Sequence, residues 1–575
     1  MDQIRLVLAV VLSIAVVIVW QALFVEPEKP ARQPRDRQAV QQQDATGAGE
    51  SGAPTAAGTA REAEVRPEVA EEAGAVAEPG SFTPTQTARA SRIVTVRTPL
   101  YEARISERGA QVVSLVLSNY KKSVRENAPY KEIVELPEGL GTLDAGFVES
   151  NGGGMRTALY EAQHSADSIR VGTDMDTLSF KWVSPTGLSI VKTYRFDPET
   201  YLIDYSISIE NQGAQARSGS LGVTLRRVMS NEAGYTFEGP IALVDNDIKE
   251  VKTSDIIKGK EDVLSGDIDW TGITGRYFLT ALVTDTESSG TVRLGATEDG
   301  LVESMFVHPK TKVAPGEVLT VEHQVFFGPK SLEILNQAGH GLARALDFGF
   351  FDVIAKPFLH LMNFLYGIYP NYGVAIIILT ILVKIVFWPL GNKSYESMNQ
   401  MKKLQPEMQA IREKFKDDKQ KMQEETMRLY KTYKINPLGG CLPMLLQIPV
   451  FIALYRMLYS AIELRHAPFA LWINDLSAPD RLFRFDFAIP FMQPPYGIPV
   501  LTVVMGASMF LQQKMSPPPG DPTQAKMMMA LPLVFTFIFI NFPSGLVLYW
   551  LVNNLISMAQ QRMSAKRSEK PRRNS

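Results

Sequence analysis

The sequence predicts a multi-domain fold, in which an all-β domain precedes an α-helical membrane part with six transmembrane helices in total. The chain has 575 residues, more than one hydrophobic core usually supports. Residues 1–330 carry 33 Lys and Arg against 45 Asp and Glu, whereas residues 331–575 carry 26 against 16. Long uncharged stretches gather in the basic second part, and short strand-like segments in the acidic first part.

Composition argues against a self-sufficient soluble enzyme. The single cysteine, Cys441, excludes an intramolecular disulfide and any multi-thiolate metal site. Six scattered histidines show no metal-ligand spacing, and no GxxxxGK[ST] phosphate loop is present. We therefore expect no catalytic residues, no metal and no cofactor.

Residues 1–25 are predicted to form an N-terminal transmembrane anchor. Leu6–Val25 is uncharged and, at about 1.5 Å per residue, long enough to cross the bilayer core. A cleaved signal peptide is the alternative, but its apolar region is normally shorter and precedes a small-residue cleavage site. Residues 26–90, rich in Ala, Glu, Pro and Gly, are predicted to be a disordered linker.

Residues 91–330 read as a β-sandwich domain. Four segments are rich in β-branched residues and partly alternate: Ile93–Thr98, Ala110–Leu117, Ser189–Phe196 and Leu202–Glu210. Residues 331–371 form a linker and an interfacial amphipathic helix. The predicted helix covers Phe350–Tyr369. Its apolar run is interrupted by charged residues and by Pro357, a pattern that suits the membrane interface better than a span.

Residues 372–561 are predicted to be the membrane core, with five spans at about 372–390, 442–462, 498–511, 527–542 and 545–559. Residues 391–436, with apolar residues at helical spacing and a turn at Asp417-Asp418, are predicted to form a cytoplasmic helical hairpin. Residues 562–575 form a basic tail. Because basic segments stay in the cytoplasm, both termini are expected inside and the β-domain outside.

Lys384 is the most informative residue, because a charge within a span is costly and usually faces a polar cavity. Thr380 lies one turn earlier on the same face. The alternative is that the Lys384 side chain snorkels to the lipid headgroups. Snorkelling is the favoured interpretation for a second charged residue within a span, Arg456. The other spans supply further polar side chains, namely Gln447, Thr502, Ser508, Asn541, Asn553 and Asn554. Ordinary interhelical hydrogen bonds would explain any one of these, but together with Lys384 they favour a hydrated groove.

Five motifs resemble the YidC family of membrane-protein insertases, which has mitochondrial and chloroplast relatives. In family order these motifs are NPLGGC (436–441), QIP (447–449), PFALW (468–472), KMSP (514–517) and FPSGLVLY (542–549). The N-terminal anchor and the large outer domain resemble the Gram-negative form, whose periplasmic domain is a β-supersandwich related in shape to sugar-binding folds.

The resemblance implies that five core helices enclose a polar groove with one cation from the second span. The family usually has Arg where this chain has Lys384, a more compact and more strongly hydrated charge. The expected groove residues are Lys384, Thr380, Gln447, Thr502, Ser508 and Asn553. The expected substrate-contact face comprises Tyr549 and Trp550 of the last span, with Met505 and Met509 from the methionine-rich helices.

The implied function is insertion and folding of nascent membrane proteins in the bacterial inner membrane, alone or with the Sec translocon and its accessory subunits. Ribosome or lipid contact is expected at the tail cations Arg562, Lys566, Arg567, Lys570, Arg572 and Arg573. No sequence-specific nucleic-acid binding is expected. The alternatives are a secondary transporter, for which no internal repeat is visible, and a membrane-anchored periplasmic carbohydrate-binding protein, which leaves the five later spans unexplained.

Overall fold

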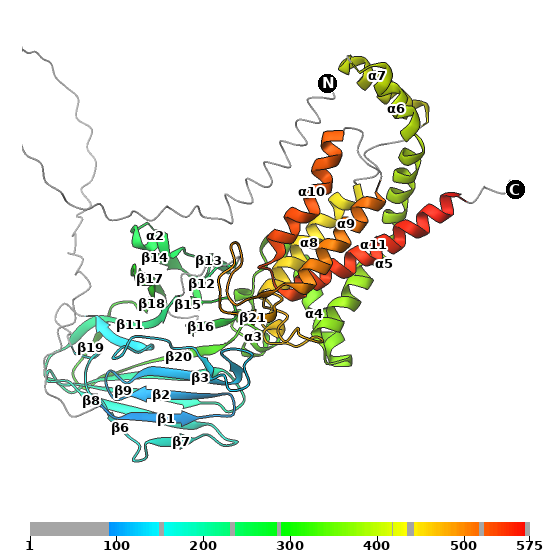
Figure 1. The fold of residues 1–575 in the computed structure, drawn as a ribbon. Helices are drawn as coiled ribbons and strands as arrows, with labels where there is room; N and C mark the ends of the chain where they lie inside the picture. Colours follow the sequence, from blue (N-terminus) through cyan, green and yellow to red (C-terminus); the bar gives the residue numbers. More distant parts are fainter. Residues whose placement is uncertain are drawn as a thin grey trace, which may run out of the picture. The chain divides into compact units, whose positions relative to one another are not determined.

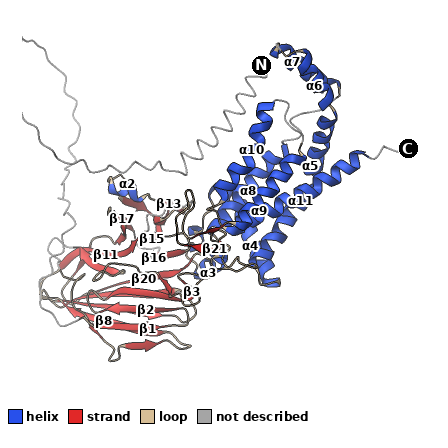
Figure 2. Cartoon of the chain, in the orientation of Figure 1, coloured by secondary structure: helices blue, strands red, loops and turns tan. Residues whose placement is uncertain are grey.

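The computed structural model describes residues 91–148, 154–229, 236–260, 262–284, 289–416, 418–433, 442–516 and 522–569, all within one compact unit, Ala90–Ser575. The predicted anchor, the predicted linker and the NPLGGC motif lie outside the described residues. Within them, an all-β region is followed by a helical region (Figures 1 and 2).

The β-region contains three sheets, and their strands pair antiparallel except where β1 meets β7. The first sheet has the order β4 (Tyr130–Glu132), β3 (Gln111–Lys121), β2 (Tyr101–Ser106), β1 (Ile93–Arg97), β7 (Ser168–Arg170). The second has the order β13 (Asp247–Glu250), β12 (Gly239–Val244), β15 (Ile268–Thr274), β16 (Phe278–Val283), β20 (Val318–Pro329), β10 (Leu202–Asn211), β9 (Leu188–Phe196), β8 (Asp176–Val183), β6 (Glu161–Ala162). The third has the order β14 (Val263–Gly266), β17 (Gly290–Ala296), β18 (Leu301–Val307), β11 (Arg217–Val228), β19 (Thr311–Val313), with β5 (Asp144–Val148) also on β11.

Strand β10 shows why these segments form a buried sheet. Its burial alternates along the strand, with Ile203, Tyr205, Ile207 and Ile209 buried and the residues between them half-buried. Alternation of this kind places one face of a strand against the core. The four segments expected from the sequence are present as β1, β3, β9 and β10, so the prediction of a large all-β region is confirmed.

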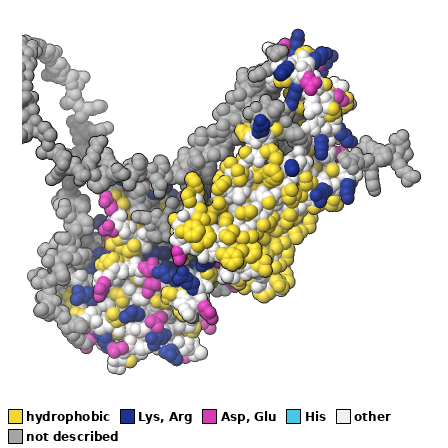
Figure 3. All heavy atoms as spheres, viewed as in Figure 1, with side chains coloured by type: hydrophobic (Ala, Val, Ile, Leu, Met, Phe, Trp, Pro, Cys, Tyr) yellow, Lys and Arg dark blue, Asp and Glu magenta, His cyan; other side chains and the backbone are white. Residues whose placement is uncertain are grey.

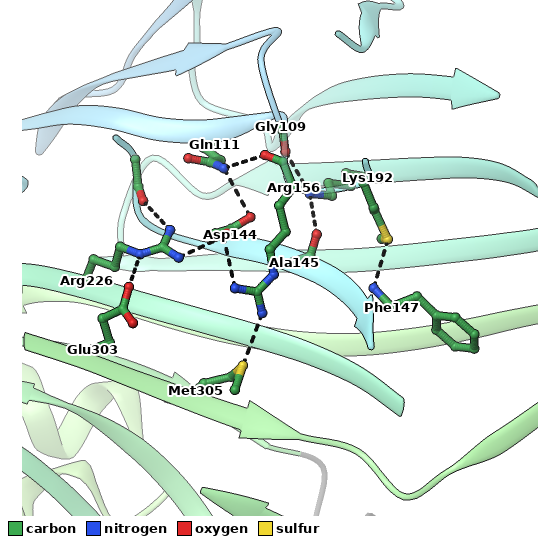
Figure 4. A network of polar contacts seen from close by, with 12 residues as sticks. Gly109, Gln111, Asp144, Ala145, Phe147, Arg156, Lys192, Arg226, Glu303 and Met305 are labelled. Atoms are coloured by element: carbon green, nitrogen blue, oxygen red, sulfur yellow. Dashed lines mark hydrogen bonds and ion pairs between the residues drawn. The ribbon is translucent and has the colours of Figure 1, made fainter. Parts of the chain in front are cut away.

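A network of charged side chains crosses the interior of the β-region (Figure 4). The Asp144 carboxylate accepts a hydrogen bond from Arg226 at 2.9 Å and another from Gln111 at 3.1 Å. The Lys192 ammonium group donates to the Gly109 and Ala145 carbonyls, and its burial lowers the pKa to about 8. Each of these buried groups is hydrogen-bonded, as a polar interior requires, so the network serves to hold the sheets together.

The helical region begins with the short helix α3 (Leu332–Ala338) and the longer helix α4 (Asp352–Ile368). Further long helices are α5 (Tyr372–Lys403), α8 (Leu442–Ser460), α9 (Val500–Met515), α10 (Pro522–Phe539) and α11 (Ser544–Glu569). Among the described residues, α5 is the one helix long and apolar enough to cross a membrane by the usual criteria, and Ala525–Phe539 is a shorter apolar helix. The number of spans therefore stays a prediction, although Figure 3 shows hydrophobic side chains covering most of the helical surface in view.

Helices α6 (Gln405–Lys414) and α7 (Lys419–Thr432) lie between α5 and α8 in the chain. The Tyr433 hydroxyl donates to Glu407 at 2.9 Å, and Tyr430 contacts the Met408 sulfur at 3.3 Å, so these two segments pack side by side. Asp418 caps α7 by accepting a hydrogen bond from the Lys421 amide. Their cytoplasmic location stays a prediction.

Candidate functional site

One face of α11 carries a row of polar side chains through the helical region. We define the α11 seam as Asn553, Asn554, Ser557, Gln560 and Gln561. Four of them are buried, with exposed fractions between 3% and 6%, and Asn553 is half-buried. Their spacing keeps them near one side of the helix, which faces α5, α8 and α9.

Lys384 points into the helical region and reaches the α11 seam. Its side chain is 9% exposed, and the ammonium group donates a 2.8 Å hydrogen bond to the Ser557 hydroxyl. The Ser557 hydroxyl in turn donates to the Asn553 carbonyl at 2.7 Å. This geometry favours a lysine that faces the helical interior over one that snorkels to the headgroups.

Two further expected groove residues also contact the seam. The Gln447 amide of α8 donates to the Asn553 side-chain oxygen at 2.9 Å. The Asn554 amide donates to the Ser508 hydroxyl of α9 at 3.0 Å. Helix α11 is therefore linked through polar side chains to α5, α8 and α9.

The two threonines lie apart from this row. The Thr380 hydroxyl donates to the Ile376 carbonyl one turn back on α5, so its hydrogen bond lies within its own helix. Thr502 is fully buried near the start of α9, and its hydroxyl has no hydrogen-bond partner among the described residues. The structure therefore does not place either hydroxyl in contact with Lys384.

Two of the expected substrate-contact residues, Tyr549 and Trp550, belong to an aromatic cluster. Trp550 packs its ring against Phe451 at 4.5 Å and Phe539 at 5.0 Å. Tyr549 and Met505 are buried, with exposed fractions of 2% and 0%, whereas Trp550 and Met509 are half-buried. Trp550 and Met509 are therefore the more accessible members of the expected substrate-contact face.

Sequence reasoning missed Ser557, Gln560 and Gln561. The Gln560 amide donates to the Trp388 carbonyl at 2.9 Å and to the Asn392 side chain at 3.0 Å. The Gln561 amide donates to the Met515 carbonyl at 3.1 Å. Their recurrence at helical spacing after Asn553 was the signal that could have found them, because a polar stripe on an apolar helix marks a buried polar contact.

The first tail cations belong to a helix. Helix α11 continues to Glu569 and carries Arg562 and Lys566, both exposed and one turn apart. The side chain of Arg567 and the whole of Lys570, Arg572 and Arg573 lie outside the described residues. Within the described residues, no group of three or more His, Cys, Asp or Glu side chains is placed to hold a metal ion.

Comparison with known proteins identifies the class. Residues 93–361 match the family model described as the YidC periplasmic domain, and residues 364–571 match the model described as the 60Kd inner membrane protein. A membrane protein insertase YidC from Geobacter metallireducens is 39% identical over 568 residues, covering 97% of each chain. One from Pelobacter propionicus is 40% identical over 568 residues, covering 97% of this chain and 98% of the relative.

A solved structure of an active YidC insertase covers 82% of this chain and 92% of its own, at 19% identity and a TM-score of 0.36. The two family models and the full-length relatives define a membrane-protein insertase with a periplasmic domain. The chain belongs to the YidC family. Its function is therefore the insertion of membrane proteins, and the inner membrane is where the family acts.

Proposed function

We propose that this insertase moves the polar flank of a nascent membrane protein along the α11 seam, with Lys384 as the cation that attracts acidic groups. The observation that carries the proposal is the hydrogen bond from Lys384 to Ser557 in the helical interior. Within the part of the chain that the structure describes, no carboxylate forms an ion pair with Lys384. A buried cation without a counterion is costly, so an arriving carboxylate would be stabilised there.

Water is part of this proposal. The Gln561 side-chain oxygen of the α11 seam is buried without a hydrogen-bond partner among the described residues. Buried polar atoms of this kind usually bind water, and water in the seam would lower the desolvation cost for a polar chain. The apolar part of the client would then pass Trp550 and Met509, with Tyr549 and Met505 behind them, into the lipid.

The membrane placement is also proposed. Six spans would put both termini in the cytoplasm, because residues 391–440 and the tail are basic, and the β-region in the periplasm. The spans would be the anchor in residues 1–25 together with α5, α8, α9, α10 and α11. The proposed partners are the Sec translocon, the ribosome and membrane lipids.

The test uses the full-length protein in proteoliposomes and two clients that differ only in acidic residues on the translocated flank. We expect Lys384→Ala to reduce insertion of the acidic client several-fold and to spare the neutral one, because only the acidic flank loses Coulomb attraction. Lys384→Arg should keep insertion of the acidic client, because the positive charge is retained. Lys393→Ala is the matched control, because it removes an exposed lysine from the same helix. If Lys384→Ala inserts both clients as well as the wild type, Lys384 is not the electrostatic element.

The tail has a separate proposed role in ribosome or lipid contact. Arg562 and Lys566 extend the cationic segment as a helix rather than as a flexible end. Binding through such cations should weaken steeply as salt rises, because counterions are released. Removal of residues 562–575 should reduce ribosome co-sedimentation at low salt. Unchanged co-sedimentation would leave the tail as a topogenic signal alone.

A further inference from the structure

Four large apolar side chains of the loop between α8 and α9 are about two-thirds exposed or more. Leu471, Phe483, Phe487 and Phe491, which we call the loop tips, are 86%, 73%, 66% and 85% exposed. Exposed apolar groups of this size gathered in one loop are unusual on a surface that faces only water.

Three of the loop tips have a backbone conformation that is unusual for residues of their size. Leu471, Phe483 and Phe491 have φ angles of 55°, 50° and 66°, in the left-handed region that bulky residues rarely occupy. Phe483 lies in an irregular stretch of β21 (Leu482–Phe485), where the pairing with β22 (Tyr496–Ile498) shifts register. Strained positions persist only where the surrounding structure holds them, and they gather at functional sites.

A buried arginine holds the base of the loop. Arg481 is 7% exposed and donates to the Pro495 carbonyl and to the Ile540 carbonyl, each at 2.8 Å. The Asn541 amide donates to the Phe491 carbonyl at 2.8 Å. The loop is therefore fastened to the turn between α10 and α11, and the exposure of Phe491 is a feature of an anchored segment.

The neighbouring Asp480 ties the same part of the loop to α9. Its carboxylate accepts from the Trp472 indole at 2.6 Å and from the Leu501 backbone amide at the start of α9. Asp480 is only 3% exposed. A carboxylate at this position satisfies an amide that the first turn of a helix leaves unpaired. The loop is thus tied both to the start of α9 and to the turn between α10 and α11.

The ends of α9 and α10 to which the loop is fastened also expose apolar side chains. Val503 on α9, and Phe537 and Ile538 on α10, are 55%, 55% and 50% exposed. Phe485 and Phe487 stack with ring centroids 4.3 Å apart, so they lie on one side of the chain, and the exposed Asp486 falls between them. Exposed apolar side chains therefore occur both in the loop and on the helix ends that hold it, and Asp486 gives the loop a polar position for water.

We propose that the loop tips insert into the periplasmic leaflet of the membrane around the helical region. The inference rests on the membrane placement proposed above. The occupant is lipid, because the loop is fastened to the ends of α9 and α10 that carry exposed apolar side chains, and aromatic side chains favour the bilayer interface. A loop fastened in this way would hold the lipid at a fixed depth beside the outer ends of the short helices α9 and α10.

The experiment measures depth in the full-length chain. Cys441→Ser removes the one native thiol, and a nitroxide is attached to a cysteine introduced at Phe487 or Phe491. The protein is reconstituted in vesicles of phosphatidylethanolamine and phosphatidylglycerol. We expect both positions to be several-fold more accessible to oxygen, relative to a water-soluble nickel complex, than a label at Asp486 in the same loop.

Two reference labels distinguish a wrong membrane placement from a wrong assignment of the loop tips to lipid. Val534 on α10, which is 51% exposed, should report lipid if the membrane placement is right. The exposed Glu298 of the β-region should report water. If Val534 reports lipid but both tips report water, the insertion of the loop is wrong while the proposed function stands. If Val534 reports water, the membrane placement fails first, and the inference fails with it.

A protein partner is the outcome to set against lipid. Tips that report water in vesicles and become protected only when an inserting client is added would assign the loop to the client, and this would overturn the proposal. Protection in vesicles without a client would support it. Arg481→Lys offers a second check, because a lysine cannot reproduce the several carbonyl contacts of the guanidinium group. That variant should reduce the difference between Phe491 and Asp486.

Discussion

The hydrogen bond between Lys384 and Ser557 is a contact that one substitution can turn into an ion pair. Ser557→Asp would place a carboxylate where the hydroxyl now accepts at 2.8 Å. The introduced carboxylate would form an ion pair with the Lys384 ammonium group and neutralise its charge. We therefore expect insertion of the acidic client to fall about as far as in Lys384→Ala. The measurement is proteoliposome insertion of the matched client pair.

Ser564→Asp is the control for this change, because it lies further along α11 and contacts Asn399 instead. It adds the same charge without reaching Lys384. If Ser557→Asp inserts the acidic client as well as Ser564→Asp does, then the charge of Lys384 is not used by clients. Ser557→Ala removes the acceptor for Lys384 together with the donor to the Asn553 carbonyl, but adds no charge. It should leave insertion within about twofold of the wild type, because the cation remains.

A second residue-scale prediction concerns two buried histidines in the β-region. The ring nitrogens of His308 and His323 lie 3.0 Å apart, and the other nitrogen of His323 faces the Val283 carbonyl. Burial lowers the pKa of His308 to about 4 and that of His323 to about 3, and for His323 the neighbouring ring adds to the effect. The folded region therefore accepts both rings as neutral.

The unfolded chain takes up these protons below its ordinary histidine pKa of about 6.5, so the neutral pair costs stability only in acid. The contribution of this pair to stability should be constant above that pH and fall as the pH drops from 6.5 towards 4, by up to about 1.4 kcal/mol per pH unit for each histidine. Hydrogen exchange of the β10 and β20 amides in the full chain measures this slope. His308→Gln with His323→Gln should flatten it, whereas His164→Gln, at a half-buried position, should not. An unchanged slope in the double variant would contradict the prediction.

At the scale of elements, α9 and α10 pack at a close contact made by a glycine. A β-carbon at Gly506 would lie 2.0 Å from the Thr536 hydroxyl oxygen, so any side chain there must push the helices apart. Small residues allow this approach between membrane helices. We expect Gly506→Ala to destabilise the protein by about 1–3 kcal/mol, as overpacking commonly does.

Removing the obstacle should relieve the strain. Thr536→Ala deletes the hydroxyl that Gly506→Ala meets, so the double variant should be more stable than the sum of the two single changes predicts. Thermal unfolding in detergent provides the comparison. Gly367→Ala is a suitable control, because a β-carbon there meets nothing within 4 Å. Simple additivity of the two changes would show that α9 and α10 do not depend on this contact.

At the scale of the whole molecule, patterns that are local in sequence were predictable. Alternation identified β9 and β10, hydropathy identified α5, and the cost of a charge in an apolar helix singled out Lys384. Contacts between distant residues were not, because nothing in the spacing pairs Lys384 with Ser557. Asn541 shows the same limit. It was expected within a span, yet it lies beyond the end of α10 and binds the α8–α9 loop.

The same limit applies to the contacts between the β-region and the helical region. The Arg276 guanidinium group donates twice to the Tyr459 carbonyl, at 2.9 and 2.7 Å, and stacks on the Tyr459 ring at 3.7 Å. Arg465 donates to the Lys121 carbonyl at 2.7 Å. Each arginine therefore satisfies a carbonyl across the boundary between the two regions, and such contacts couple the stability of both.

These contacts make the consequence of removing the β-region specific. Deletion of residues 30–328 takes away Arg276 and Lys121 but leaves Lys384 and the α11 seam, which all lie after residue 371. We expect the deletion to keep most of the insertion activity, measured with the same clients in proteoliposomes, while lowering the midpoint of thermal unfolding of the helical region. Arg276→Ala in the full-length chain should lower that midpoint in the same direction and leave insertion unchanged. Loss of insertion in a stably expressed deletion, with Arg276→Ala still active, would mean that the β-region takes a direct part in insertion.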